Sequence, residues 1–198
     1  MFCDLVGSTP LAEKLDPEDL RQVILAYQQV CAEEIRRFDG YLARYVGDGL
    51  LVYFSYPQAH EDDAQRAVRA GLGIVAALPI LNTQLQQTVE AIHELPLQVR
   101  IGIHTGLVVV GDMGGGGYRD PLAIVGETPN VAARVQGIAE PNTVAISAAT
   151  YRLVQGLFEC QDRGRQELKG VSTPVPVYRV LRESEAQSRF EAAVSKGL

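Results

Sequence analysis

The stretch YLARYVGDGLLVYF, residues 41–54, decides the fold. It holds two runs of β-forming residues that are joined through Gly47, Asp48 and Gly49. Two such runs separated by turn-forming residues predict a β-hairpin. We therefore expect Asp48 at the tip of this hairpin.

A long helix is predicted on each side of the hairpin. On the N-terminal side, Asp16 and Pro17 supply an N-cap and a first helical residue, and apolar residues then recur at helical spacing as far as Gly40. On the C-terminal side, residues 60–63 carry acids suited to a first helical turn, and the apolar spacing continues up to Pro79. We expect this second helix to break near the proline, which removes a backbone hydrogen bond from a helix interior.

The rest of the chain continues to alternate strands with helices. The predicted elements are a strand at residues 2–6, a second hairpin at 97–111, a helix at 126–139, and strands at 144–146, 158–160 and 175–180. Strands joined partly by hairpins and partly through long helices are typical of an α+β domain and not of a doubly wound parallel sheet. We predict a ferredoxin-like βαββαβ core, with a mixed, mainly antiparallel sheet flanked by helices and a C-terminal β/α extension.

The composition of the chain limits which kinds of protein and which partners are expected. The chain has 198 residues, of which 46% are hydrophobic and 21% charged, enough apolar side chains for one packed domain and too little charge for a disordered chain. Its net charge of −6 is the wrong sign for binding a phosphate backbone over a broad surface, so no nucleic acid partner is expected. A compact anionic ligand is compatible with this charge, because a few cations or bound metal ions can dominate one cleft.

No targeting or membrane segment is expected. The longest apolar-rich stretch, residues 67–85, is interrupted by Arg69 and Pro79 and so falls short of the roughly 20 apolar residues that span a bilayer. The first residues form neither a basic nor an apolar leader, and the three cysteines are scattered without a CxxC pair. These features favour a soluble, cytoplasmic protein with reduced thiols.

Two aspartates are candidate metal ligands. Asp4 lies near the end of the first predicted strand and Asp48 at the hairpin tip, places that are adjacent in a ferredoxin-like arrangement. Paired carboxylates hold hard divalent cations, which usually keep phosphate oxygens as further ligands. The alternative for each residue is structural, with Asp4 capping the next turn and Asp48 suiting a tight turn.

A loop of small residues follows the first strand. Gly7, Ser8 and Thr9 lie in a connection that runs into a helix, where free backbone amides can bind anionic oxygens. The loop is not a Walker motif, since GxxxxGK[ST] does not occur in the chain. Taken alone, it is a weak indication of phosphate binding.

A second candidate pair lies in the helix predicted at residues 126–139. Asn130 and Arg134 are four residues apart and therefore share one helix face. An amide suits a sugar hydroxyl or ring oxygen, and a guanidinium offers a permanent charge with forked donors to a phosphate oxygen. The alternative is a solvated or locally paired helix face.

The motifs together resemble, in order and spacing, those of the catalytic domain of the class III adenylyl and guanylyl cyclases, of the bacterial, soluble type. The stretches that carry the resemblance are FCDLVGST at residues 2–9, RYVGDG at 44–49, IGIHTG at 101–106 and VGETPNVAAR at 125–134. LKGV at residues 168–171 also resembles the closing segment of that family. We therefore expect a catalytic domain at residues 1–182 and an exposed tail or linker at residues 183–198, leading to a further regulatory or effector domain.

The resemblance implies a reaction. Members of this family cyclise a nucleoside triphosphate: the ribose 3′ oxygen attacks the α-phosphorus, and pyrophosphate leaves. By resemblance, Asp4, Asp48 and the backbone carbonyl of Leu5 would hold two Mg²⁺ or Mn²⁺ ions, which lower the pKa of the 3′ hydroxyl and neutralise the leaving group. Asn130 would orient the ribose, and Arg134 would stabilise charge on the α-phosphate.

The resemblance also implies how each site is assembled. The substrate-binding positions of the family fall on Gly7, Ser8, Thr9, Gly47 and Lys169. The last of these matches a lysine that contacts the terminal phosphates. In the family, the metal-binding aspartates of one subunit face the Asn and Arg of the other, so a homodimer would have two equivalent shared sites.

Two positions depart from the family pattern, and both lie where the purine is selected. Adenylyl cyclases usually carry Lys four residues before the second metal aspartate, and Asp or Thr three residues before the Gly of the Asn/Arg motif, where guanylyl cyclases tend to Glu and Cys. Here these positions are Arg44 and Ala123. Arg44 is only a donor, which suits adenine N1 or guanine O6, and Ala123 offers no acceptor to the adenine amino group. The Glu that would accept the N1 hydrogen of guanine is absent, so ATP is the expected substrate, with relaxed selectivity against GTP.

The expected activity is that of an adenylate cyclase producing 3′,5′-cyclic AMP and pyrophosphate. One alternative is a nucleotide-binding regulatory domain with weak or no turnover, which ATP would stabilise against heat without product formation. Another is a dimerisation scaffold, for which ATP would have neither effect.

Overall fold

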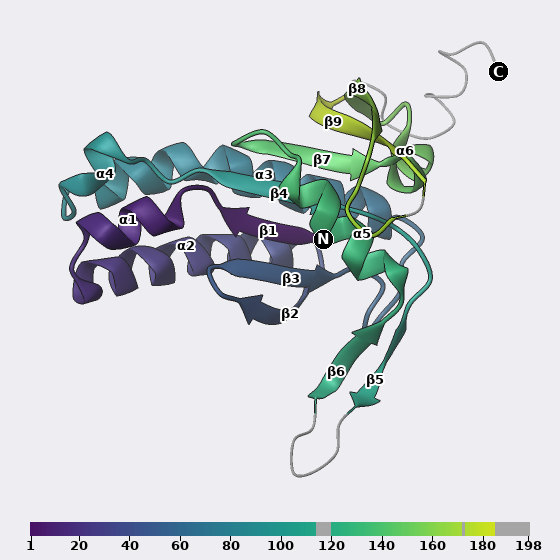
Figure 1. Cartoon of the computed structure of the whole chain (residues 1–198), viewed down its shortest axis with the longest axis horizontal. Helices are drawn as coiled ribbons and strands as arrows, with labels where there is room; N and C mark the ends of the chain where they lie inside the picture. The colour runs from purple at the N-terminus through teal and green to yellow at the C-terminus, as the bar shows by residue number, and fades with distance from the viewer. Residues whose placement is uncertain (114–119, 172, 185–198) are drawn as a thin grey trace.

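The computed structural model describes residues 1–113, 120–171 and 173–184, so most of the predicted tail lies outside the described residues. Its main feature is a seven-stranded sheet of order β2-β3-β1-β4-β7-β9-β8, beside which β5 and β6 form a separate two-stranded arm (Figure 1). The strands are β1 (Phe2–Leu5), β2 (Tyr41–Val46), β3 (Gly49–Tyr53), β4 (Val99–Ile103), β5 (Val109–Met113), β6 (Asp120–Val125), β7 (Thr143–Ser147), β8 (Phe158–Gln166) and β9 (Val175–Glu183). The helices are α1 (Ser8–Lys14), α2 (Pro17–Arg37), α3 (Asp63–Leu85), α4 (Ala91–Glu94), α5 (Glu127–Gly137) and α6 (Ala148–Val154).

The sheet is mixed and mainly antiparallel, as the sequence predicts. Within the described part of the chain, β4 and β7 are the one pair of neighbouring strands that runs parallel. The hairpin of β2 and β3 forms at the expected place, with Val46 opposite Gly49 and the turn between them. The predicted α+β class and ferredoxin-like core are confirmed.

Helices cover both faces of the sheet (Figure 1). Ile101 and Gly102 are neighbours on β4 and therefore point to opposite faces. The Ile101 side chain lies against α3, where a Cβ on Gly71 would come within 3.4 Å. On the other face, a Cβ on Gly102 would lie 2.1 Å from the backbone nitrogen of Gln136 in α5. The glycine therefore lets α5 approach the sheet closely enough to be held against it.

The first long helix follows its sequence signals. The Asp16 side chain accepts hydrogen bonds from two backbone N–H groups of the first turn, and Pro17 begins the helix. The helix ends at Arg37, slightly before the predicted end at Gly40. Its buried residues are Val23, Tyr27, Cys31 and Ile35.

The second long helix does not break at Pro79, contrary to the sequence prediction. Helix α3 runs through this exposed proline to Leu85. Leu78, Leu81 and Leu85 are buried around it. Burying a leucine side chain is worth about 1.5 to 3 kcal/mol, so the three together outweigh the cost of about 3 kcal/mol for a proline inside a helix.

The hairpin predicted at residues 97–111 is also wrong. Strand β4 pairs with β1 on one side and with β7 on the other, so both of its edges are taken. The strand that follows, β5, pairs instead with β6 in the arm. Leu107, in the segment that leads to the arm, is 95% exposed, and Val109, at the start of β5, is 70% exposed.

By length and composition alone, helix α3 is long and apolar enough to cross a membrane, and it is the one such helix among the residues described. The sequence analysis expected no such segment. In the fold it packs against α2 and the sheet, and 39% of its apolar window is buried. Its buried residues join the main core cluster, which is the arrangement of a core helix.

Candidate active site

The first strand and the β2–β3 turn bring the two predicted metal ligands together. Asp4 lies on β1, and Asp48 directly precedes β3, the antiparallel neighbour of β1. A Cβ on Gly49 would lie 3.0 Å from Asp4 Oδ1 and 3.1 Å from the Cys3 carbonyl oxygen. A glycine at this position therefore lets the turn that carries Asp48 pass directly beside Asp4.

The two carboxylates interact electrostatically. Partial burial and the negative charge of Asp48 raise the pKa of Asp4 above its ordinary value of 3.8, while the Leu5 N–H and the charge of Arg100 oppose the rise. The Oδ2 atom of Asp48 is buried and has no hydrogen-bond partner among the residues described. A buried acceptor without a partner is costly, and a cation between the carboxylates would remove that cost.

These oxygens suit a hard divalent cation. Mg²⁺ is usually held by one or two carboxylates and leaves its other positions to water and phosphate oxygens. The described ranges contain no group of three or more His, Cys, Asp or Glu side chains that would enclose a metal ion. Two carboxylates beside the backbone of Leu5 therefore fit an ion that also binds a phosphorylated substrate.

Arg100 is a site residue that the sequence interpretation missed. It lies on β4 directly opposite Asp4 in the pairing with β1, and its charge lowers the pKa of Asp4. Its Nε atom is buried and lacks a hydrogen-bond partner within the described structure. The residue stands next to the motif at residues 101–106, but only the strand pairing places it beside Asp4.

The loop after β1 adopts a backbone form that glycine favours. Gly7 has a φ of 71° and occupies the N-cap of α1, which begins at Ser8. No side chain caps this helix, and Ser8 is half-buried while Thr9 is exposed. The loop therefore presents backbone to solvent a few residues after Asp4.

The second predicted pair lies on a different element. Asn130 and Arg134 are both exposed on α5, away from its buried valines. The helix begins after Gly126, whose φ of 142° favours glycine. Among the residues that the structure describes, no hydrogen bond or ion pair joins either side chain to Asp4 or Asp48. The members of each pair thus share one part of the fold, and no bond within the described structure links one pair to the other.

The other predicted substrate contacts are spread over several elements. Lys169 is exposed, but the preceding Leu168 is buried. Leu168 belongs to the same core cluster as the buried valines of α5, so the segment that carries Lys169 packs against that helix. Arg44 has an exposed side chain on β2, and Ala123 lies on β6 in the arm. Gly47 forms the β2–β3 turn with a φ of 64°.

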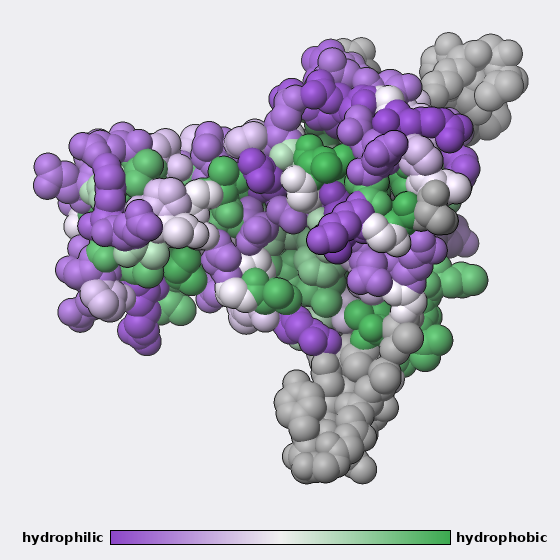
Figure 2. All heavy atoms as spheres, viewed as in Figure 1, coloured by the Kyte–Doolittle hydropathy of each residue, from purple (hydrophilic) through white to green (hydrophobic). Residues whose placement is uncertain are grey.

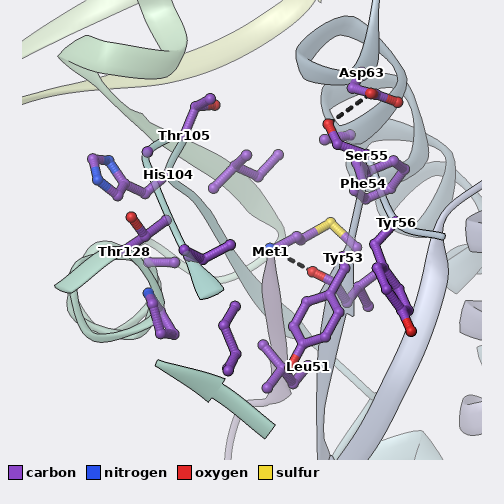
Figure 3. Close-up of a pocket in the computed structure, with 18 of the residues that line it drawn as sticks. Met1, Leu51, Tyr53, Phe54, Ser55, Tyr56, Asp63, His104, Thr105 and Thr128 are labelled. Carbon is purple, nitrogen blue, oxygen red and sulfur yellow. Dashed lines mark hydrogen bonds between the residues drawn. The ribbon is translucent and has the colours of Figure 1, made fainter. Parts of the chain in front are cut away.

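A cavity of about 410 Å³ lies beside the first turn of α5, between it, the arm and the strands β1 and β3 (Figure 3). Thr128 and His104 line it on one side, and Leu51 and Tyr53 line it on the other. The predicted site residues are not among the described residues that line this cavity. The cavity therefore lies beside the first turn of α5 and apart from the candidate metal ligands.

Exposed apolar side chains gather on the arm and on the β2–β3 hairpin. Leu107, Val108 and Val109 are exposed at the root of the arm, as are Tyr45 and Val46 near the hairpin tip. Hydrophobic atoms are visible at the root of the arm in Figure 2. Apolar side chains grouped in this way on a surface mark a contact with another molecule.

Comparisons with known proteins identify the family of this chain. A family model described as "Adenylate and Guanylate cyclase catalytic domain" matches residues 1–182. An uncharacterized protein of Rhizobium meliloti (strain 1021) is 34% identical over 190 residues, which are 96% of this chain. The chain spans only 18% of that relative's length.

Solved structures share the fold and the family. The adenylyl cyclase CyaB from P. aeruginosa is similar with a TM-score of 0.86 at 30% identity, covering 94% of each chain. The guanylyl cyclase Cya2 is similar with a TM-score of 0.81 at 30% identity, covering 94% of this chain and 92% of that one. Because the family model covers nearly the whole sequence, the chain belongs to the adenylate and guanylate cyclase catalytic-domain family.

Proposed function

We propose that this chain is an adenylate cyclase catalytic domain, which converts ATP to 3′,5′-cyclic AMP and pyrophosphate. The observation that carries the proposal is the pair of adjacent carboxylates, Asp4 and Asp48, next to Arg100, with one buried oxygen of Asp48 lacking a hydrogen bond in the described structure. Such a pair is costly unless a cation joins it. The proposal includes residues 1–182 as the catalytic unit, acting in the cytoplasm as part of a longer protein.

The charged residues act on the phosphates and the metal ions. Asp4, Asp48 and the Leu5 carbonyl would hold two Mg²⁺ or Mn²⁺ ions, which lower the pKa of the attacking hydroxyl and neutralise phosphate charge when bound. Arg100 adds a permanent positive charge beside the carboxylates, suited to a phosphate oxygen. Arg134 binds the α-phosphate, where negative charge develops as the 3′ oxygen attacks.

The polar residues orient the rest of the nucleotide. Asn130 hydrogen-bonds the ribose through its amide, which directs the 3′ hydroxyl toward the α-phosphorus. Lys169 and the backbone of Gly7, Ser8 and Thr9 bind the terminal phosphates. Together these contacts hold the leaving pyrophosphate while the ring closes.

Two copies of the chain share each site in this proposal. Support comes from the exposed apolar side chains of Leu107, at the root of the arm, and Val109, at the start of β5. It also comes from the placement of the two pairs on different elements, with no hydrogen bond or ion pair between them among the described residues. Apolar side chains exposed in this way fit a symmetric contact with a second copy. The carboxylates of one copy would then face Asn130 and Arg134 of the other, which gives two equivalent sites.

The purine is selected weakly in this proposal. Arg44 has only donors, which suit adenine N1, and neither Arg44 nor Ala123 is the glutamate that would accept the N1 hydrogen of guanine. A position without an acceptor loses the strong discrimination that a hydrogen bond to the purine provides. Turnover of GTP is therefore the second candidate activity.

Product formation tests the proposal. The purified chain, at a concentration at which dimers are demonstrated, is incubated with Mn²⁺ and either ATP or GTP and assayed for cyclic nucleotide. We expect cyclic AMP, with slower formation of cyclic GMP. A preference for GTP would correct the substrate, and no product from either would contradict the enzyme. Thermal stabilisation by ATP without product would instead identify a nucleotide-binding regulatory domain.

A further inference from the structure

The hydroxyl of Thr128 makes a bond that leaves its own helix. Thr128 Oγ1 donates to the Leu107 carbonyl oxygen at 2.9 Å, across 21 residues of sequence. Leu107 lies in the segment that leaves β4 for the arm, and Thr128 lies in the first turn of α5 (Figures 1 and 3). The bond therefore ties the helix that carries Asn130 and Arg134 to the root of the arm.

Two glycines make room for this bond. A Cβ on Gly106 would lie 2.5 Å from Thr128 Oγ1, which is too close for two atoms that are not bonded. A Cβ on Gly126 would lie 3.2 Å from the Leu107 carbonyl oxygen. The absence of a side chain at both glycines thus leaves room for the Thr128 hydroxyl and the Leu107 carbonyl oxygen.

Leu107 is held through its backbone, since its side chain is 95% exposed and packs little. The bond from Thr128 therefore links this segment to α5 through the Leu107 backbone. Thr128 lies two residues before Asn130, in a helix turn whose N–H groups lack intrahelical partners. Losing the bond would let this turn shift relative to the arm.

We propose that Thr128 is a positioning residue for the cyclase reaction. Its hydroxyl, bonded to the Leu107 carbonyl, sets the orientation in which α5 presents Asn130 and Arg134. This inference rests on the proposed function, in which Arg134 stabilises charge that develops only as the 3′ oxygen attacks. An effect on the transition state falls on kcat more than on KM.

The test compares two substitutions at this position. Thr128→Val keeps the shape and loses the donor, whereas Thr128→Ser keeps the hydroxyl. Thr128→Val is expected to lower kcat about fivefold to tenfold, the effect of one hydrogen bond, and to change KM by less than about twofold. Thr128→Ser should keep at least about half of the wild-type kcat. Equal losses in both variants, or no loss in Thr128→Val, would overturn the inference.

Thr105→Val is the matched control. Thr105 Oγ1 lies 3.0 Å from Thr150 Oγ1, so this bond leads from the wall of the same cavity to α6 and not to α5. Its kcat should stay within about twofold of the wild type. A loss as large as that of Thr128→Val would show a general effect of the cavity wall and would count against a positioning role.

Protein concentration separates positioning from dimerisation. The Thr128→Val defect should persist when the protein concentration is raised tenfold, because the dimer is intact and α5 is displaced within it. Full recovery at the higher concentration would show that the hydroxyl supports dimerisation alone, and the inference would fail.

Amide hydrogen exchange distinguishes this inference from the proposed function. Because the bond lies at the surface, Thr128→Val is expected to fold. A peptide covering residues 127–137 should exchange faster in Thr128→Val than in either the wild type or Thr128→Ser. If the wild type makes no cyclic nucleotide, the proposed function fails, and exchange still shows whether the hydroxyl holds α5. Unchanged exchange in Thr128→Val would contradict the inference in either case.

Discussion

The carboxylate half of the candidate site is partly buried beside paired strands, whereas the half on α5 is exposed. Asp4 and Asp48 lie side by side and partly buried, with Arg100 on the neighbouring strand. Asn130 and Arg134 are exposed on a helix whose first turn is tied to the arm. One chain thus places the two candidate metal ligands side by side, whereas the candidate anion-binding pair lies exposed on its surface.

Asp48→Asn alters the carboxylate half of the site and has the largest expected effect on activity. It keeps the shape of the side chain and removes its charge, so cyclase activity should fall by at least about 10³-fold. Mn²⁺ is expected to raise the melting temperature of the wild type, and this rise should vanish in Asp48→Asn. Thermal unfolding with and without Mn²⁺ measures this rise.

A remote aspartate provides the control for Asp48→Asn. Asp162 on β8 accepts from the Gly164 N–H, which an asparagine there can also do, so Asp162→Asn should keep both activity and the Mn²⁺ effect. Residual activity in Asp48→Asn above a tenth of the wild-type rate would show that this carboxylate does not hold the metal.

Arg134→Ala removes the guanidinium from the exposed half of the site on α5. Removing a donor that binds developing charge should lower kcat about 10²- to 10³-fold. Because the side chain is exposed, the free energy of unfolding should change by less than about 0.5 kcal/mol. Arg152→Ala, at an exposed arginine on α6, serves as the control and should leave kcat unchanged. Equal rates for the two variants would remove Arg134 from the site.

Leu107→Ser tests whether the exposed half of the site depends on a second copy. Losing one apolar contact of the arm should weaken the dimer about tenfold, so specific activity should drop at low protein concentration and return at high concentration. Ile80→Ser, at a 65% exposed residue of α3, should leave the dimer unchanged. Analytical ultracentrifugation alongside the assay checks both, and an unaltered dimer in Leu107→Ser would exclude the arm from the interface.

The pH dependence of stability tests the raised pKa of Asp4 in the carboxylate half of the site. Because burial and Asp48 raise the pKa of Asp4, its ionised form is favoured less in the folded than in the unfolded chain. This penalty is absent below pH 3.8 and complete above the folded-state pKa. Asp4→Asn should therefore raise the melting temperature in EDTA by about 1 to 2 °C at neutral pH, a small gain because the carboxylate is partly solvated. The gain should shrink as the pH falls toward 4, and a gain that grew instead would contradict this assignment.

Local structure was predictable where the residues themselves carry the signal. The glycines around Asp48 indicate the hairpin, and the Asp16–Pro17 pair indicates the start of α2. The two errors came from long-range packing. Pro79 is tolerated because distant parts of the core bury the leucines around it, and β5 leaves the sheet because β7 already occupies the edge of β4.

The candidate site was predictable as two separate pairs. Spacing alone puts Asn130 and Arg134 on one helix face, and the structure places both as exposed residues of α5. The proximity of Asp4 and Asp48 needed an assumed topology, which the sheet order now supplies. Arg100 was missed because its place beside Asp4 follows from strand register, which no local pattern encodes.

Mixing two inactive chains tests the central claim, that each site takes its carboxylates from one copy and its Asn–Arg pair from the other. Asp48→Ala and Arg134→Ala chains, each expected to be nearly inactive as homodimers, are mixed in equal amounts under conditions that exchange subunits. About a quarter of the wild-type rate is predicted, because half of the dimers are mixed and each mixed dimer has one intact site of two. A mixture that stays as inactive as its parents, although mixed dimers are demonstrated, would contradict the shared site.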